Sequence, residues 1–349
     1  MPRLYFKCMG KLKAVGLCSG GLDSILAAML VKKQGFEVHL LHFISPYFGY
    51  KGDTLKKLEE RIKELDMFFH PVLVGDDYVE QVLKNPPHGK GSAFNACIDC
   101  HLFMILKAKQ FMSENEASFV FTGEVLGQRP MSQTRRSLNT IAKKCGLDGR
   151  LVRPLSAKKL DISIPEKEGV LNRHELMDIC GRGRKKQLEL AKELGLKEYP
   201  QPGGGCKFTD PNLVKRLNKF TEINPDYSWR DLTLLMNFRH LYIGDGYYLV
   251  LSRDQKDLEG LSSYFDMGIT IMAANHVPSS TGLLINYSSD RTKFSDEMLT
   301  LAGRVVARYT KAFQLSVSKI EMCFFKDGKV FDERTLEPIC ESDLKRFLL

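Results

Sequence analysis

The sequence predicts an α/β fold, in which a doubly wound parallel sheet is followed by a helical appendage and a smaller α+β domain. Three observations predict it. Short apolar runs alternate with amphipathic segments over the first 160 residues, the pattern becomes helical and basic from residue 172, and short alternating strands begin near residue 239. With 349 residues, the chain is long enough for two or three domains.

The first domain, residues 1–165, is expected to form the parallel sheet. Its predicted strands are Ala14–Cys18, Val38–Ile44, Pro71–Val74, Phe119–Thr122 and Leu151–Pro154, and its predicted helices are Ile25–Gln34, Thr54–Leu65, Cys100–Met112 and Ser132–Lys144. Each helical segment is long enough for a right-handed crossover. Ligands bind beyond the carboxyl ends of such strands, which is where Ser19 and Gly123 fall.

Two further regions are expected after this domain. Residues 166–221 form a basic helical segment that carries Cys206, with helices predicted at His174–Ile179, Lys185–Leu194 and Pro211–Phe220. Residues 222–349 form a separate α+β domain. Its predicted strands are 241–243, 247–251, 269–274 and 282–287, followed by a helix at 296–311 and a hairpin of 320–326 and 329–331.

Positive charge is concentrated in the first two thirds of the chain. Residues 1–220 carry 36 Lys and Arg against 24 Asp and Glu, whereas residues 221–349 carry 15 against 18. This balance favours a polyanionic partner such as RNA, although charge alone suits a basic enzyme nearly as well. The clearest local runs are Arg135-Arg136, Lys143-Lys144 and Arg182 to Lys186.

The sequence carries no sign of secretion or of a membrane span. Its first residues form no long apolar run, and no apolar stretch approaches the ~20 residues that cross a bilayer. We therefore expect a cytoplasmic protein whose nine cysteines serve as thiols, metal ligands or catalysts rather than as a disulfide framework. The oligomeric state stays open, and a homodimer is compatible with the sequence.

The most informative segment is Leu17-Cys18-Ser19-Gly20-Gly21-Leu22-Asp23-Ser24, at an expected turn from strand to helix. Its two glycines let backbone N–H groups approach phosphate oxygens, and its two serine hydroxyls can join them at the positive end of the helix. Its aspartate would hold magnesium or orient the phosphates. A kinase-type P-loop is excluded because no lysine follows the glycines, and the alternative is a serine-capped turn without a ligand.

Three cysteines form a second motif. Cys97 and Cys100 stand three residues apart at a helix start, where they could chelate a metal, form a redox disulfide or supply a nucleophile of low pKa. Cys206 follows three glycines on a distant loop. Three such cysteines would hold three irons of a [4Fe-4S] cluster and leave one iron open for an exogenous sulfur. A structural zinc would need His101 as fourth ligand, but helix geometry turns it away from the pair.

Together these motifs resemble tRNA thiouridine synthases of the PP-loop superfamily, which split ATP to AMP and pyrophosphate. Asn95 to His101 with Cys206-Lys207-Phe208 is similar to the 2-thiouridylases, although Cys97 stands where that group has aspartate. This departure brings the chain closer to the iron–sulfur-dependent thiolases. Thr122 to Gln128 with Ser132-Gln133-Thr134 resembles the 4-thiouridine synthases instead. The target position therefore stays open between C2 and C4 of uridine.

The resemblance implies an enzyme that thiolates tRNA with ATP, Mg²⁺, a [4Fe-4S] cluster and a sulfur donor, either sulfide or a persulfide carrier. The catalytic residues would be Asp23, Cys97, Cys100 and Cys206, of which the three cysteines would bind the cluster. The ATP-binding residues would be Cys18, Ser19, Gly20, Gly21, Asp23, Ser24, Phe43, Gly123 and Gln128. The alternatives are a cluster-free relay, with a Cys206 persulfide resolved by Cys100, and a non-catalytic RNA-binding protein that retains a nucleotide fold.

The C-terminal region is similar to the RNA-binding domain of NFACT proteins, around Phe238-Arg239 and Asp245 to Val250. Its acidic balance argues against strong phosphate binding. Tyr247 and Tyr248 either stack on bases or face a core. Across the chain, the residues expected to contact RNA are Arg129, Arg135, Arg136, Arg182, Arg184, Lys185 and Arg239.

Overall fold

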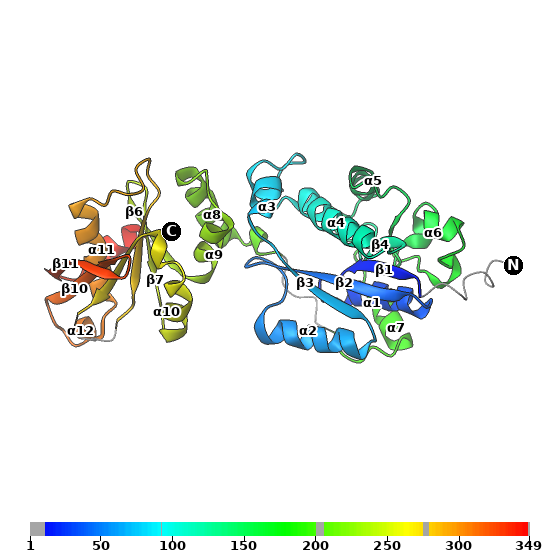
Figure 1. Cartoon of the computed structure of the whole chain (residues 1–349), viewed down its shortest axis with the longest axis horizontal. Coiled ribbons are helices and arrows are strands. Elements are labelled where there is room, and N and C mark those ends of the chain that lie inside the picture. The colour runs from blue at the N-terminus through cyan, green and yellow to red at the C-terminus, as the bar shows by residue number, and fades with distance from the viewer. Residues whose placement is uncertain (1–10, 92, 200–205, 275–278, 348–349) are drawn as a thin grey trace. The chain divides into compact units, whose positions relative to one another are not determined.

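The computed structural model describes residues 11–91, 93–199, 206–274 and 279–347. The chain divides into two compact units, Met1–Asp210 and Pro211–Leu349 (Figure 1). The boundary falls after residue 210 and not after residue 221, so helix α8 (Pro211–Ile223) belongs to the second unit. Phe220 of this helix packs edge-on against Tyr248 and Tyr287, which explains the difference.

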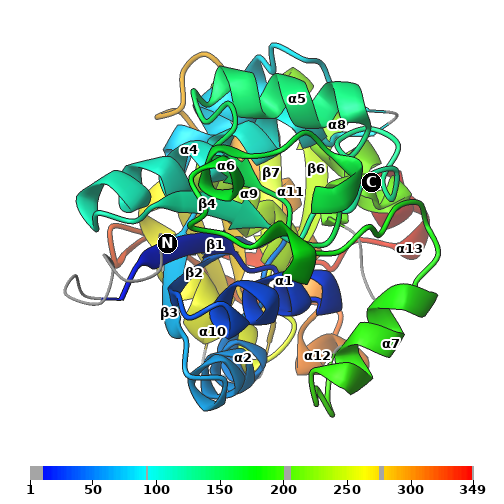
Figure 2. The same ribbon diagram turned by 90° about the vertical axis from the view of Figure 1, so that its right-hand side faces the viewer.

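The first unit contains a five-stranded parallel sheet with the order β3-β2-β1-β4-β5. Its strands are β1 (Lys13–Leu17), β2 (Glu37–Ile44), β3 (Phe68–Leu73), β4 (Phe119–Thr122) and β5 (Leu151–Val152). Helices cover both faces (Figure 2), with α1 (Leu22–Lys33), α2 (Gly52–Glu64) and α7 (Lys185–Glu193) on one and α4 (Cys97–Glu114) and α5 (Arg135–Lys144) on the other. The predicted doubly wound sheet is confirmed.

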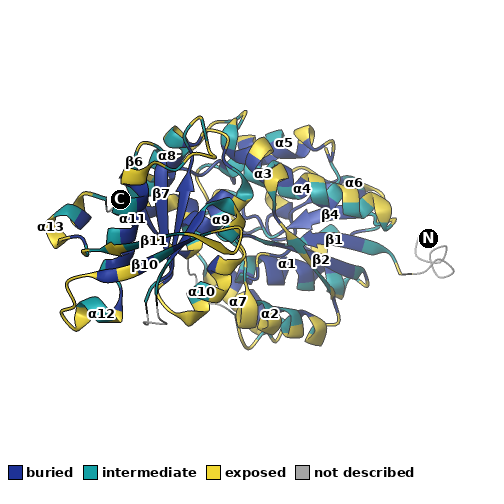
Figure 3. Ribbon diagram, turned by 60° about the vertical axis from the view of Figure 1, so that its left-hand side comes forward, coloured by how far each residue is buried: buried dark blue, intermediate teal, exposed yellow. Residues whose placement is uncertain are grey.

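Apolar packing explains why these segments form the layers. The inner strands are buried along most of their length, whereas the helices keep exposed outer faces (Figure 3). A Cβ atom on Gly16 of β1 would lie only 2.3 Å from the Phe121 ring, so glycine lets the rings of β4 pack across β1. The unit also contains α3 (Asp76–Tyr78), a π-helical turn (Val79–Lys84) and α6 (Ile164–Lys167).

The prediction of a helix at 174–179 is wrong. Only a 3-10 turn forms there, at Arg173–Glu175. The residues after it are extended, because the Met177 and Ile179 N–H groups donate to the Pro154 and Leu155 carbonyls at 2.9 and 2.8 Å. Backbone pairing beyond β5 therefore overrides the helical pattern of this segment.

The second unit contains an antiparallel sheet with the order β11-β10-β8-β9-β7-β6. Its strands are β6 (Arg239–Gly244), β7 (Tyr247–Leu251), β8 (Ile269–Ala273), β9 (Gly282–Asn286), β10 (Ile320–Lys326) and β11 (Lys329–Leu336). Helix α11 (Asp296–Arg308) contributes its apolar side to the main core. The remaining helices are α9 (Trp229–Asn237), α10 (Gln255–Ser262), α12 (Lys311–Gln314) and α13 (Glu341–Leu344).

The sequence left open whether the two tyrosines of β7 stack on bases or face a core, and the structure decides between these alternatives. Tyr247 is 7% exposed and Tyr248 is 1% exposed, so both are core residues and not platforms for base stacking. The Tyr248 ring contacts Phe220 and Tyr287 instead. Among the described residues of both units, no helix is long and apolar enough to cross a membrane.

Candidate functional site

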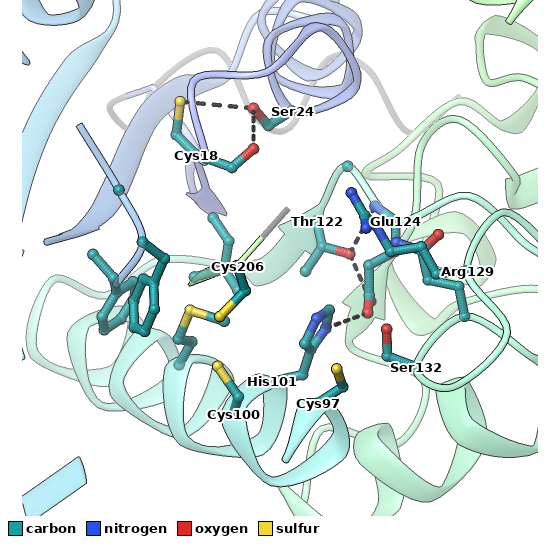
Figure 4. Close-up of a pocket in the computed structure, with 18 of the residues that line it drawn as sticks. Cys18, Ser24, Cys97, Cys100, His101, Thr122, Glu124, Arg129, Ser132 and Cys206 are labelled. Atoms are coloured by element: carbon teal, nitrogen blue, oxygen red, sulfur yellow. Dashed lines mark hydrogen bonds and ion pairs between the residues drawn. The ribbon is translucent and has the colours of Figure 1, made fainter. Parts of the chain in front are cut away.

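The carboxyl ends of β1, β2 and β4 open into a cavity of ≈ 350 Å³ (Figure 4), a size typical of small-molecule sites. Most of the residues predicted for ATP and sulfur chemistry line it. They are Cys18, Ser19, Asp23, Ser24, Phe43, Cys97, Cys100, Gly123, Gln128 and Cys206, and Arg129, which was predicted to contact RNA, lines the cavity with them. Gly20 and Gly21 form the adjoining turn and are not part of the lining.

The turn after β1 has the geometry of an anion cradle. Gly20 adopts a φ of +80°, and a Cβ atom there would lie 2.3 Å from the Tyr50 ring, so only glycine fits. Gly21 caps α1 without a side-chain hydrogen bond, which leaves the first N–H groups of the helix available to a ligand. The Ser24 hydroxyl donates to the Gly21 carbonyl at 2.8 Å and accepts from the Ser19 hydroxyl at 3.3 Å.

Gly123 brings the end of β4 into direct contact with this turn. A Cβ atom on Gly123 would lie 2.6 Å from the Cα and N atoms of Ser24 and 2.7 Å from the carbonyl carbon of Asp23. These are backbone atoms, which cannot swing aside as a flexible side chain can. The absence of a side chain at residue 123 therefore sets the position of the first turn of α1.

Asp23 lies in that first turn, with one carboxylate oxygen paired and the other open. Its Oδ2 atom accepts from Gln128 Nε2 at 3.0 Å and stands 3.8 Å from Arg184 Nη2. Its Oδ1 atom is buried and has no hydrogen-bond partner among the residues that the structure describes. A buried carboxylate oxygen without a partner is the type of ligand that Mg²⁺ prefers, so the residues present fit the cation expected with ATP.

His42 of β2 holds the backbone beside the cradle through two hydrogen bonds, and the sequence analysis missed this residue. Its Nδ1 atom donates to the Cys18 carbonyl at 2.7 Å, and its Nε2 atom accepts from the Tyr50 N–H at 3.0 Å. Burial lowers the pKa of His42, so the ring is neutral and holds this tautomer. A histidine inside a buried apolar strand was the available signal.

The three predicted cysteines come together around the other side of the cavity. Cys97 and Cys100 lie on the first turn of α4, and Cys206 follows on its own loop (Figure 4). The Cys206 loop is held by two backbone bonds at 3.1 Å, from the Lys207 N–H to the Tyr47 carbonyl and from the Phe94 N–H to the Phe208 carbonyl. The Tyr47 and Phe208 rings also stack at 4.2 Å.

Burial keeps the Cys100 and Cys206 thiols protonated. It raises the pKa of Cys100 to about 12 and that of Cys206 to about 11, and the mutual repulsion of the sulfurs contributes in the same direction. Of the three alternatives that the sequence left open for the pair, the nucleophile of low pKa is therefore disfavoured for Cys100, because the loss of solvation outweighs the hydrogen bond it receives.

The three cysteines form a donor set that suits an iron–sulfur cluster. Within the described residues, no three His, Cys, Asp or Glu side chains are close enough to hold a single metal ion. A cluster binds each cysteine to a different iron, so its ligands stand farther apart than the ligands of one ion. Cys97, Cys100 and Cys206 line one cavity, and, in addition to burial, the Cys206 and Cys97 sulfurs raise the pKa of Cys100, so the donor set fits a cluster better than a single zinc ion.

Tyr78 is a second residue that the sequence analysis missed. Its ring is 1% exposed, and its hydroxyl is hydrogen-bonded to the Cys100 thiol. It ends α3 immediately before the π-helical turn Val79–Lys84, a rare conformation that often occurs at functional sites. No motif surrounds Tyr78, so the sequence held no signal for it.

Glu124 organises the floor of the site. Its carboxylate is bonded to His101 Nδ1 at 2.8 Å, to Arg153 Nε at 3.0 Å and to the Thr122 hydroxyl at 2.9 Å. Burial alone would raise the pKa of Glu124, but the Arg153 charge and the hydrogen bonds from His101 and Thr122 lower it to about 2. His101 Nδ1 is thus committed to Glu124, and within the described part of the chain His101 forms no metal-holding group with the thiols.

The predicted RNA-contacting residues are more dispersed. Arg129 is exposed at the cavity, and Arg135 and Arg136 are exposed in the first turn of α5. Arg239 belongs to the second unit, where its guanidinium lies 5.3 Å from the Tyr309 ring centre. Around the start of α7, Arg182 and Lys185 are exposed, whereas Arg184 lies beside Asp23.

Both units match known families. Residues 10–167 match the family described as thiamine biosynthesis protein (ThiI). The first unit carries a ThiI-type PP-loop domain. Residues 239–348 match the NFACT protein RNA binding domain, so a ThiI-type domain is followed here by an NFACT-type domain.

Relatives of the ThiI-type domain carry the name probable tRNA sulfurtransferase. The one from Thermococcus kodakarensis is 30% identical over 148 residues, covering 41% of this chain and 36% of the relative. The one from Finegoldia magna is 32% identical over 145 residues, covering 40% and 35%. The chain thus spans about a third of the length of these relatives.

Two solved structures are also similar to this chain. A 4-thiouridine synthetase in complex with RNA and ATP is 22% identical, covers 53% of this chain and 51% of its own, and has a TM-score of 0.35. The U34-tRNA thiolase NcsA from Methanococcus maripaludis with its [4Fe-4S] cluster is 17% identical, covers 63% and 71%, and has a TM-score of 0.29.

Proposed function

We propose that this protein is an ATP-dependent tRNA sulfurtransferase that replaces a carbonyl oxygen of uridine with sulfur. The observation that carries the proposal is one cavity lined on one side by the phosphate cradle and on the other by Cys97, Cys100 and Cys206. Adenylation of the uridine oxygen and attack of sulfur on the carbon that carries it can therefore take place in the same cavity. The sulfurtransferases that match the ThiI-type domain support this assignment.

The first step activates the uridine. The N–H groups at the start of α1, with Ser19 and Ser24, bind the phosphates of ATP, and Asp23 holds Mg²⁺ through its open oxygen. The uridine oxygen forms a bond to the α-phosphorus, and the bond to the bridging oxygen breaks, so that pyrophosphate leaves with the electron pair. The oxygen has then become part of a good leaving group, AMP.

The second step introduces sulfur. Cys97, Cys100 and Cys206 would hold a [4Fe-4S] cluster, which supplies an open iron that binds the sulfur to be transferred. A sulfur nucleophile in the cavity attacks the activated carbon, and AMP departs with the former uridine oxygen. The cluster-free alternative is a Cys206 persulfide whose outer sulfur attacks, after which Cys100 releases the product by forming a disulfide with Cys206. The raised pKa values of both thiols disfavour that relay.

The acceptor is proposed to be tRNA. Arg129 at the mouth of the cavity, Arg135 and Arg136 on α5, and Arg182 and Lys185 near α7 supply exposed positive charge for its backbone. The match of the second unit to an RNA-binding domain supports the same partner, and Arg239 is its candidate contact.

The test is a thiolation assay on protein that has been purified without oxygen and reconstituted with iron and sulfide. tRNA is incubated with ATP and digested, and its nucleosides are separated to detect 2-thiouridine and 4-thiouridine, which also decides the target position. Asp23→Ala should abolish AMP formation, whereas Asp53→Ala, an exposed aspartate in the first turn of α2, should not.

The cluster assignment has its own control. Cys97→Ala should lose the iron–sulfur absorbance and the thiolation, whereas Cys180→Ala, at an exposed cysteine outside the cavity, should keep both. Thiolation by a Cys97→Ala protein without that absorbance would rule out the cluster mechanism. RNA binding without any AMP formation would instead favour the non-catalytic alternative.

A further inference from the structure

Arg184 belongs to the basic run that the sequence analysis assigned to RNA binding, but its side chain lies at the phosphate cradle. Its Nη2 atom stands 3.8 Å from Asp23 Oδ2, and the two side chains are only 30% and 17% exposed. Its neighbours Arg182 and Lys185 are exposed, and Lys186 pairs with Asp178 at 2.8 Å. Within this basic run, the structure thus directs Arg184 toward the ATP end of the cavity.

The backbone before Arg184 is fixed to the same loop that shapes the site. The Gly181 N–H donates to the Leu126 carbonyl at 2.7 Å, and Leu126 and Cys180 form a parallel bridge. A Cβ atom on Gly127 would lie 3.5 Å from the Gly181 nitrogen, so the two segments pack closely. Leu126 and Gly127 directly precede Gln128, the residue that donates to Asp23.

The charges around Asp23 indicate what Arg184 does when ATP binds. Oδ2 accepts a hydrogen bond from Gln128 and forms an ion pair with Arg184, whereas the buried Oδ1 has no hydrogen-bond partner among the described residues. A cation on Oδ1 would neutralise the carboxylate and weaken its hold on Arg184, while Gln128 keeps the side chain oriented. The phosphates that arrive with that cation carry more negative charge than the carboxylate, and two of their oxygens can accept parallel hydrogen bonds from the planar guanidinium.

We propose that Arg184 binds the β- and γ-phosphates of ATP and stabilises the departing pyrophosphate. In the free protein it pairs with Asp23, and in the complex it transfers to the phosphates. As the bond between the α-phosphorus and the bridging oxygen breaks, the electron pair stays with pyrophosphate, and the guanidinium meets the added negative charge. The catalytic part of this role depends on the adenylation proposed above, whereas the binding part does not.

Nucleotide calorimetry tests the inference without tRNA or sulfur. Wild-type protein and Arg184→Ala are titrated with AMP, with MgATP and with magnesium pyrophosphate. Because Arg184 contacts only the phosphates beyond the α position, the variant should bind ATP and pyrophosphate roughly tenfold to a hundredfold more weakly, the range for a hydrogen bond to a charged group, with AMP unchanged. Arg184→Lys should recover part of the loss, since it keeps the charge without the planar fork.

Lys192→Ala is the control, because it removes an exposed positive charge from helix α7 and should leave all three affinities unchanged. Equal weakening of AMP and ATP by Arg184→Ala would show a structural role and overturn the inference, as would unchanged ATP and pyrophosphate binding. Equal thermal melts of both alanine variants and wild type verify the fold. If Arg184→Ala loses affinity for ATP but not for AMP while the wild-type protein makes no thiouridine, the proposed function is refuted and this inference stands.

Discussion

Gly123→Ala should disable adenylation although it adds a single methyl group. The new Cβ atom would lie 2.6 Å from two backbone atoms of Ser24, and ordinary contact begins at 3.4 Å, so the turn and the strand end must separate by about 0.8 Å. Overpacking of this kind costs about 1–3 kcal/mol in the free energy of unfolding. A misplacement near 1 Å at a reacting centre costs on the order of 10²-fold in rate.

The assay measures AMP formed from ATP in the presence of tRNA, with urea unfolding in parallel. Gly75→Ala is the control, because the nearest atom to its Cβ would be Asp77 Oδ1 at 3.9 Å, an ordinary contact. We expect Gly123→Ala to lose about a hundredfold in rate while staying folded, and the control to match wild type. AMP formation by Gly123→Ala at the wild-type rate would refute the claim that this contact positions the cradle.

Three further predictions follow from buried groups. Glu124→Gln leaves Arg153 buried without its charge partner and should cost roughly 3–5 kcal/mol in urea unfolding, whereas Glu168→Gln, in the exposed pair with Arg150, should cost about 0–1 kcal/mol. Burial lowers the pKa of His240 from 6.5 to about 3, so the unfolded chain binds the proton at a higher pH than the folded chain does. The second unit should therefore lose stability as the pH falls from 6.5 toward 3. In urea titrations at several pH values, His240→Phe should flatten this dependence of stability on pH, and an unchanged dependence would contradict the assignment. Tyr78→Phe removes the hydroxyl bonded to Cys100 and should lower the reduction potential of a reconstituted cluster without loss of its absorbance, whereas an unchanged potential would show that the hydroxyl does not act on the cluster.

The inner strands of the sheet were predictable because they are apolar runs that become buried on both faces. Phe119–Thr122 was predicted with the bounds that the structure has, and all four of its residues are buried. Helix α1 begins at Leu22, whereas the predicted helix began at Ile25. The prediction began three residues late because Asp23 and Ser24, in the first turn of the helix, interrupt the apolar pattern. The polar residues of a ligand-binding turn thus concealed the start of the helix.

The phosphate cradle and the three cysteines were predictable because residue type and spacing carry their chemistry. Residues brought in by tertiary contacts were not. Tyr78 reaches Cys100 from a separate helix, and Arg184 reaches Asp23 through the pairing of Gly181 with Leu126. A basic run shows where charge is plentiful along the chain, but the backbone contacts decide which arginine faces the site.

The most direct test of the central claim is the stoichiometry of AMP and thiouridine. Reconstituted protein with ATP, tRNA and sulfide as the sulfur donor should yield the two products in equal amounts, because each uridine oxygen leaves as part of one AMP. The yield of both should disappear together in Asp23→Ala, whereas Cys206→Ala should lose the thiouridine. AMP formation without any thiouridine in the reconstituted wild-type protein, or thiouridine without AMP, would contradict the account.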